Sequence, residues 1–322
     1  MSDVFGSIDI GTGSVLCLAV EKSADGLMRE TINESVITAL GAGTASDPSV
    51  RQTSMERTLA PVIDYVEKLR QAGATSISIV GTSALRKAPN RDEFIKRVRQ
   101  RTGLNVEVIS GEEEARLTFW GATQTLSTHV GPVVVMDVGG GSTELVFGHL
   151  SRASTGGLPP PELATSLPIG ALTLTDRFIT RYPVSRIEME RLRAGIQDAV
   201  AVKCVEELVT GAKSESPSPL LIAVGGSATT LVAMEHEIVP YVPVKVHRAR
   251  ISREIILEHI ERLGEMSLDE RYGIPALPRG RAPVIDAGLS ILHELLGLFG
   301  AGAMTVSDRG LRYGVIVRDS HA

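Results

Sequence analysis

Cysteine is scarce in this sequence, which has two in 322 residues. Cys17 lies in an apolar stretch and Cys204 in a helical one, and neither has the spacing of a metal ligand. Such low cysteine content argues against a disulfide framework and favours a reduced, cytoplasmic setting. The chain also lacks a run of 18 apolar residues and an N-terminal basic segment followed by an apolar one. We therefore expect neither membrane insertion nor secretion.

An excess of positive charge is also missing, because the formal net charge is −5. This balance excludes a generally basic nucleic-acid binder, but local arginines and helix N-termini could still attract a polyanionic substrate. Hydrophobic residues make up 43% and charged residues 22% of the chain, as in ordinary globular proteins. A chain of 322 residues is long for one core and suits two domains of about 150 residues each.

The most informative stretch is Asp137-Val138-Gly139-Gly140-Gly141-Ser142-Thr143-Glu144. Apolar residues lead into it at 133–136 and out of it at 145–147, which predicts a strand, a glycine-rich turn and a second strand. Glycines lack Cβ atoms, so backbone N–H groups can close on anionic oxygens. The two end carboxylates would repel phosphate, but they suit a Mg²⁺ ion that binds phosphate. The alternative is a plain hairpin turn with a hydrogen-bonding Asp.

Two further glycine-rich turns occur. The first, Asp9-Ile10-Gly11-Thr12-Gly13-Ser14, again lies between apolar runs, at 4–10 and 15–20. This weak internal repeat predicts two similar domains that face each other with phosphate between them. The other, Gly225-Gly226-Ser227, follows an apolar strand and enters a helix, where an N-terminus can bind an anion. Tight packing of strand on helix would explain that turn equally well.

Strands and helices alternate along the remaining chain, which predicts an α/β layer arrangement. We expect a helix after a capping box at residues 53–56, a long helix from Ser185 to about residue 209, and a terminal helix capped by Asp308. Another helix begins with the segment Gly111-Glu112-Glu113-Glu114-Ala115-Arg116. Carboxylates in the first turn of a helix interact favourably with the helix dipole, so these glutamates could simply stabilise the helix and have no catalytic role. Arg279 and Arg281 stand near a helix start and either hold phosphate or lie in solvent.

Eight segments in order resemble the exopolyphosphatase and guanosine pentaphosphate phosphohydrolase family, part of the actin-like superfamily that includes sugar kinases, acetate kinases and heat-shock chaperone ATPases. They are DIGTGS at Asp9, GTSALRKAPN at Gly81, GEEEAR at Gly111, DVGGGSTE at Asp137, LPIGALTLTDRF at Leu167, VGGSATTL at Val224, GRAPVIDAG at Gly280 and SDRGLRYG at Ser307. The resemblance implies two actin-like (ribonuclease H-like) α/β domains with a cleft between them. They would comprise residues 1–124 and 125–307, and a C-terminal helix of about residues 308–322 would pack back on the first.

The resemblance also implies roles for individual residues. Glu114, the carboxylate before Ala in GEEEAR, matches the catalytic base, and Arg86 matches an arginine that meets phosphate in the cleft. Asp137 and Glu144 match carboxylates associated with Mg²⁺, for which Mn²⁺ is an alternative ion. The substrate-binding positions lie on the three loops and are Asp9, Gly11, Thr12, Gly13, Ser14, Gly139, Gly140, Gly141, Ser142, Gly225, Gly226 and Ser227.

The activity implied is Mg²⁺-dependent hydrolysis of the terminal phosphoanhydride of inorganic polyphosphate, with release of orthophosphate. One alternative is removal of the 5′ phosphate from guanosine pentaphosphate. In that case guanosine pentaphosphate and guanosine tetraphosphate would both bind to the protein. Ala39 stands where the family often carries an arginine and argues mildly against this alternative. Others are an actin-like kinase and a non-enzymatic sensor of polyphosphate or an alarmone. The resemblance allows a homodimer.

Overall fold

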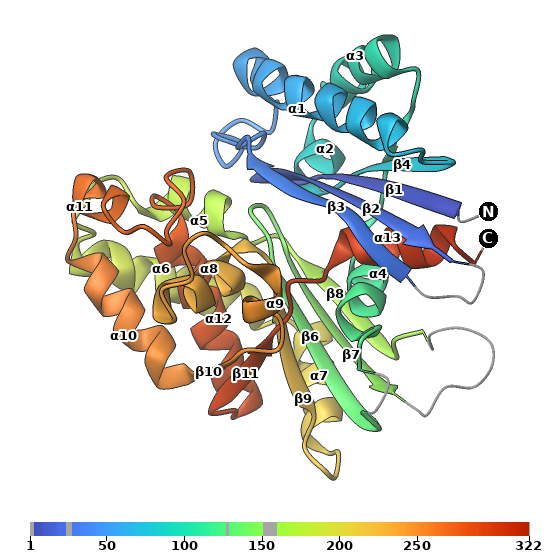
Figure 1. Ribbon diagram of the computed structural model, residues 1–322. Helices are drawn as coiled ribbons and strands as arrows, with labels where there is room; N and C mark the ends of the chain where they lie inside the picture. The colour runs from blue at the N-terminus through green and yellow to red at the C-terminus, as the bar shows by residue number, and fades with distance from the viewer. Residues whose placement is uncertain (1–2, 24–27, 127–128, 151–159, 322) are drawn as a thin grey trace.

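The computed structural model describes residues 3–23, 28–126, 129–150 and 160–321 (Figure 1). Two sheets carry the fold. The first has the order β3 (Met28–Ile37), β2 (Ser14–Lys22), β1 (Asp3–Ile10), β4 (Ser76–Gly81) and β5 (Val106–Val108). The second has the order β10 (Arg250–Ser252), β11 (Ala303–Val306), β9 (Leu220–Val224), β6 (Gly131–Val138), β7 (Thr143–Leu150) and β8 (Leu163–Leu167).

The two sheets repeat one topology. An antiparallel hairpin, β1–β2 or β6–β7, lies beside a third antiparallel strand, β3 or β8. On its other side the first hairpin strand pairs in parallel with β4 or β9. This shared arrangement confirms the predicted two-part α/β fold. The domain boundary at residue 124 stays a prediction, and residues 127 and 128, just after it, lie outside the described ranges.

Helices cover the sheets in layers. The core of the first sheet includes α1 (Gln52–Gln71), α2 (Ser83–Lys87) and α3 (Arg91–Thr102). The larger core of the second sheet lies against α12 (Ile285–Phe299), with which α5 (Ala171–Phe178), α6 (Arg186–Val200), α7 (Lys203–Lys213), α8 (Gly226–Glu235) and α10 (Arg253–Gly264) pack. Two short helices, α9 (Pro243–Val246) and α11 (Leu268–Tyr272), complete this part. Among the described residues, no helix is both long and apolar enough to cross a membrane.

Two helices lie between the sheets. Figure 1 shows α13 (Leu311–Asp319) beside α4 (Gly111–Thr123), and both chain ends on that side of the molecule. Ala115 and Phe119 of α4 pack on the second sheet. α13 lies on the first sheet, where the Ser7 hydroxyl donates to the Arg312 carbonyl oxygen at 2.9 Å. α4 and α13 therefore join the two halves of the fold.

Three local predictions were wrong. α1 begins one residue before the proposed capping box, after Arg51, and has no side-chain cap. The helix expected from Ser185 to residue 209 is two helices, because α6 packs on α5 and α12 whereas α7 turns onto strands β6–β8. Asp308 does not cap α13, which begins after Gly310; its carboxylate instead accepts a hydrogen bond from the Tyr241 hydroxyl.

The crossing of α4 and α13 depends on two glycines and can be tested. A Cβ on Gly314 would lie 1.9 Å from the Leu117 carbonyl oxygen, and one on Gly121 would lie 2.0 Å from that of Gly310. Both obstacles are backbone atoms, so Gly314→Ala should destabilise the protein by about 1–3 kcal/mol. Urea unfolding measures the change. The matched control is Gly264→Ala in α10, where a Cβ meets nothing within 4 Å. A Gly314→Ala variant as stable as this control would contradict the close crossing.

Candidate functional site

Two of the three glycine-rich loops meet face to face. The loop of residues 11–13 joins β1 to β2, and residues 139–142 join β6 to β7. A Cβ on Gly141 would lie 2.4 Å from the Thr12 hydroxyl oxygen, and one on Gly140 would lie 3.0 Å from the Gly13 nitrogen. Any larger residue at these positions would push the loops apart. The glycines therefore permit contact between the loops as well as backbone freedom.

In these two loops the backbone carbonyl groups and the backbone N–H groups differ in their hydrogen bonding. The Gly13 oxygen accepts two N–H groups that follow β3, at 3.0 and 2.8 Å, and the Gly140 oxygen accepts two from the first turn of α5, at 2.9 and 3.1 Å. By contrast, the N–H groups of Thr12, Gly13, Gly140 and Gly141 donate no hydrogen bond within the described ranges. Their carbonyls are occupied and their amides are available, which is the arrangement that binds an anion.

The third loop lies beside the second. Gly225 has a φ of +97°, and a Cβ there would lie 2.5 Å from the Val138 carbonyl oxygen. Ser227, two residues on, lines the same cleft from the first turn of α8, which begins at Gly226. Packing of loop on loop thus accounts for the glycine at 225, and the helix N-terminus still faces the cleft.

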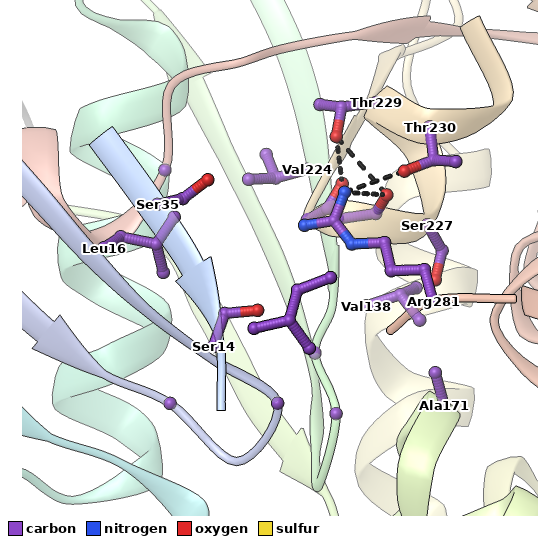
Figure 2. Close-up of a pocket in the computed structure, with 18 of the residues that line it drawn as sticks. Ser14, Leu16, Ser35, Val138, Ala171, Val224, Ser227, Thr229, Thr230 and Arg281 are labelled. Carbon is purple, nitrogen blue, oxygen red and sulfur yellow. Dashed lines mark hydrogen bonds between the residues drawn. The ribbon is translucent and has the colours of Figure 1, made fainter. Parts of the chain in front are cut away.

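Arg281 adds a positive charge at this third loop. Its Nη1 donates to the Gly226 carbonyl oxygen at 3.0 Å and to the Thr230 hydroxyl oxygen at 2.7 Å (Figure 2). Among the described residues, no carboxylate lies within ion-pairing distance of this guanidinium. The sequence left its role open between phosphate binding and solvent exposure. The structure places it in the cleft, whereas Arg279 stacks on the Tyr272 ring at 4.5 Å.

Glu114 lies at the N-terminus of α4 with a cationic partner. The Ser110 hydroxyl caps this helix by accepting from Glu113 N–H, so Glu114 is not needed for capping. Its Oε2 accepts from Arg86 Nη1 at 2.9 Å, and Arg86 also donates to the Ile109 carbonyl oxygen at 2.9 Å. Burial raises the pKa of the Glu114 carboxyl to about 7, although the charge of Arg86 opposes this change.

Three more carboxylates share the cleft with Glu114. Burial raises the pKa of Asp137 to about 6, and a hydrogen bond from the Thr118 hydroxyl opposes the rise. Burial and the neighbouring Glu114 and Asp137 raise the pKa of both Asp9 and Glu144 well above the ordinary range. Glu144 accepts hydroxyl hydrogen bonds from Ser166, at 2.7 Å, and from Ser142. The cleft thus holds four carboxyl groups in a desolvated space, where each binds its proton more tightly than it would in water.

Asp9 is the carboxylate best placed for a cation. Its Oδ1 is buried and has no hydrogen-bond partner within the described ranges. In the part of the chain that the structure describes, no group of three or more His, Cys, Asp or Glu residues is arranged so that it could hold a metal ion. A Mg²⁺ ion does not need one, because it usually binds one or two carboxylates together with water and substrate phosphate. Asp9 and Asp137 supply such hard oxygen donors.

The loops and side chains enclose a cleft of about 730 Å³. Its two ends differ. Glu144, Ser166 and the start of α4 lie at the β7–β8 side, where a Cβ on Gly111 would lie 2.6 Å from Ser166 Cβ. Gly225 and Arg281 lie on the other side of β6, at β9. Asp137, on β6, is therefore flanked by Glu114 on one side and Arg281 on the other.

Most predicted site residues line this cleft. They are Asp9, Gly11, Thr12, Gly13, Ser14, Glu114, Asp137, Gly139, Gly140, Gly141, Ser142, Glu144, Gly225, Gly226 and Ser227. Arg86 does not line it and instead contacts Glu114 from behind. Sequence reasoning missed Lys87, whose Nζ donates to the Gly141 carbonyl oxygen at 3.1 Å across the two halves. The chemical roles of these residues stay predictions.

Comparisons with known proteins concern the chain as a whole. The Ppx/GppA phosphatase family model matches residues 19–322. Exopolyphosphatase 2 of Mycobacterium tuberculosis is 29% identical over 324 residues, covering 96% of each chain. The guanosine-5′-triphosphate,3′-diphosphate pyrophosphatase of Vibrio parahaemolyticus is 28% identical over 98% of this chain and 59% of its own. The crystal structure of the Aquifex aeolicus Ppx/GppA family member superposes with a TM-score of 0.77 at 30% identity, covering 99% of this chain and 98% of that one.

The buried charge of Glu114 predicts a pH-dependent stability of the protein in a metal chelator. Because burial raises this pKa from 4.5 to about 7, the folded state binds the proton more tightly than the unfolded state. The contribution of Glu114 to the free energy of unfolding should therefore fall as pH rises from about 4.5 to about 7, by about 1.4 kcal/mol per pH unit at most. Glu114→Gln should flatten this fall and raise the melting temperature at pH 8.

The control for this measurement is Glu112→Gln, because Glu112 is exposed on the same helical turn. It should leave the pH dependence unchanged. Equal melting temperatures for Glu114→Gln and the wild type at pH 8 would show that ionisation of Glu114 does not destabilise the folded protein.

Proposed function

The chain belongs to the Ppx/GppA phosphatase family, and we propose that it is an exopolyphosphatase that removes orthophosphate from the end of inorganic polyphosphate. The observation that carries this proposal is the pair of facing loops with available N–H groups, beside a carboxylate of raised pKa. The loops offer a terminal phosphate hydrogen bonds without a covalent nucleophile. Glu114 offers a base for water. Exopolyphosphatase 2, named for this activity, aligns along 96% of its length.

The residues of the chain divide the work of hydrolysis. The N–H groups of residues 12–13 and 140–141 hold the equatorial oxygens of the terminal phosphate. Glu114 accepts a proton from the attacking water, whose oxygen forms the new P–O bond. A carboxyl pKa of about 7 lies near the working pH, which favours such a base. The bridging P–O bond breaks, and the shortened chain leaves with the electron pair. Arg86 acts through Glu114 by fixing its orientation.

We assign Mg²⁺ to Asp9 and Asp137, with Mn²⁺ as a substitute. The unpartnered Asp9 oxygen supports this choice, whereas the oxygens of Glu144 already receive two hydroxyl hydrogen bonds. The residues present fit the ion, because the donors are carboxylates and the space between them is buried. When bound, the ion would neutralise charge on the phosphate oxygens. Glu144 would then hold Ser142 and Ser166 in place.

A second candidate substrate is guanosine pentaphosphate. The observation in its favour is the apolar outer part of the cleft, where Val239, Pro240 and Tyr241 could contact a purine ring. The Vibrio relative carries the name of that activity. Hydrolysis would again occur at the terminal phosphate between the glycine loops. The same base and loops would serve both substrates, so only direct competition between them separates the two functions.

The test is Mg²⁺-dependent phosphate release measured side by side from polyphosphate, guanosine pentaphosphate and ATP. We expect the largest kcat/KM with polyphosphate and loss of activity in EDTA. Glu114→Gln should lower kcat by at least about 100-fold, because a general base contributes about 10²–10⁴, while substrate binding persists. Glu112→Gln should behave as the wild type. Hydrolysis of guanosine pentaphosphate alone would establish the second candidate, and full activity in Glu114→Gln would remove Glu114 as the base.

A further inference from the structure

The position of Glu114 restricts where the rest of a substrate chain can lie. In phosphoryl transfer the attacking and leaving oxygens are roughly in line. Water activated by Glu114 attacks from the β7–β8 side of the cleft, so the leaving chain must extend the opposite way, toward β9 and Arg281. The phosphate units next to the scissile bond therefore pass through this outer part of the cleft.

The outer part of the cleft has largely apolar walls. On one side are the residues that end β3, where a Cβ on Gly280 would lie 2.8 Å from Ile37. Facing them are Val239 and Tyr241, which are 55% and 44% exposed, and the prolines at 240, 275 and 278. Figure 2 shows Ser35 and Leu16 on one wall, across from Arg281. Polyphosphate loses its water here and gains few hydrogen bonds, which costs free energy.

Positive charge is equally sparse in this space. Among the described residues that line the cleft, Arg281 and Arg312 are the cations. Arg312 lies 3.9 Å from the Asp308 carboxylate, and its charge also acts on Asp9, so little of it is left for a substrate. Beyond the cleft, Arg309 pairs with Glu30 at 2.9 Å. Of these described arginines, Arg281 alone has no carboxylate within 4.0 Å, although the charge of Asp308 also acts on it. It can serve only the first phosphates after the scissile bond.

We propose that the cleft selects short phosphate chains and releases its product after each cleavage. This inference rests on the proposed exopolyphosphatase function and adds its substrate subclass. A long chain carries a negative charge on each unit, and binding such a chain requires a row of cations that this path does not supply. A short chain places its few charges on the glycine loops and Arg281, and its remaining length is in solvent.

The test compares polyphosphates of defined length, from triphosphate to chains of several hundred units, at equal concentrations of chain ends. We expect kcat/KM per chain end to stay level or to fall as length increases. Gel analysis of long chains should show all of them shortening together, without full-length chains persisting beside orthophosphate. Higher kcat/KM for long chains, degraded one at a time, would overturn the inference. Absence of hydrolysis at every length would instead refute the proposed function itself.

Variants that add positive charge to the walls of the cleft test the inference more directly. Val239→Lys and Ser35→Lys each place a cation on one wall of the outer cleft, at exposed positions outside the glycine loops. Each should raise kcat/KM for long chains by about threefold to fivefold, with little change for triphosphate, and the gain should shrink as salt increases.

The matched control is Val244→Lys, because Val244 is 81% exposed and does not line the cleft. It adds the same charge nearby and should change kcat/KM neither for triphosphate nor for long chains. Two lining variants are used so that misfolding of one does not decide the result, and circular dichroism verifies both. If all three variants leave long-chain kcat/KM unchanged, missing charge does not limit chain length and the inference fails.

Discussion

The contact between the two glycine hairpins is the constraint on which the site depends. Thr12 lies against Gly141, and Gly140 lies against Gly13, at separations that no side chain would allow. A Cβ on Gly170, just before α5, would likewise lie 2.5 Å from the Gly140 carbonyl carbon. The two halves of the fold can therefore approach this closely only because glycines occupy positions 140, 141 and 170. This approach brings two sets of available N–H groups into one small space.

The buried carboxyl groups of the cleft destabilise the folded protein when they are ionised. Asp9, Glu114, Asp137 and Glu144 are held in one desolvated space, and burial raises the pKa of each. Arg86 offsets part of the cost at Glu114. A cation and a phosphate would complete the charge balance. Under the proposed function, the cost of holding these carboxyl groups together is offset when a metal ion and phosphate bind.

Local sequence patterns predict much of the fold, but they do not predict several contacts of the candidate site. The hairpins at Asp9 and Asp137 were predictable, because a glycine-rich turn between two apolar runs is a short-range signal. The break between α6 and α7 was not, since apolar periodicity continues across it and only packing on different partners separates the helices. Arg281 and Lys87 reach residues 54 or more positions away, at Gly226 and Gly141, and no local pattern encodes such contacts.

We infer that the terminal phosphate lies between the two glycine loops, with Glu114 on its attacked face and the leaving chain toward Arg281. A crystal structure with a non-hydrolysable triphosphate analogue and Mg²⁺ tests it most directly. We expect the terminal phosphorus at the N–H groups of residues 12–13 and 140–141, with the bridging atom on the Arg281 side. An analogue bound in the opposite direction, with its bridging atom toward Glu114, would contradict the role of Glu114 as the base.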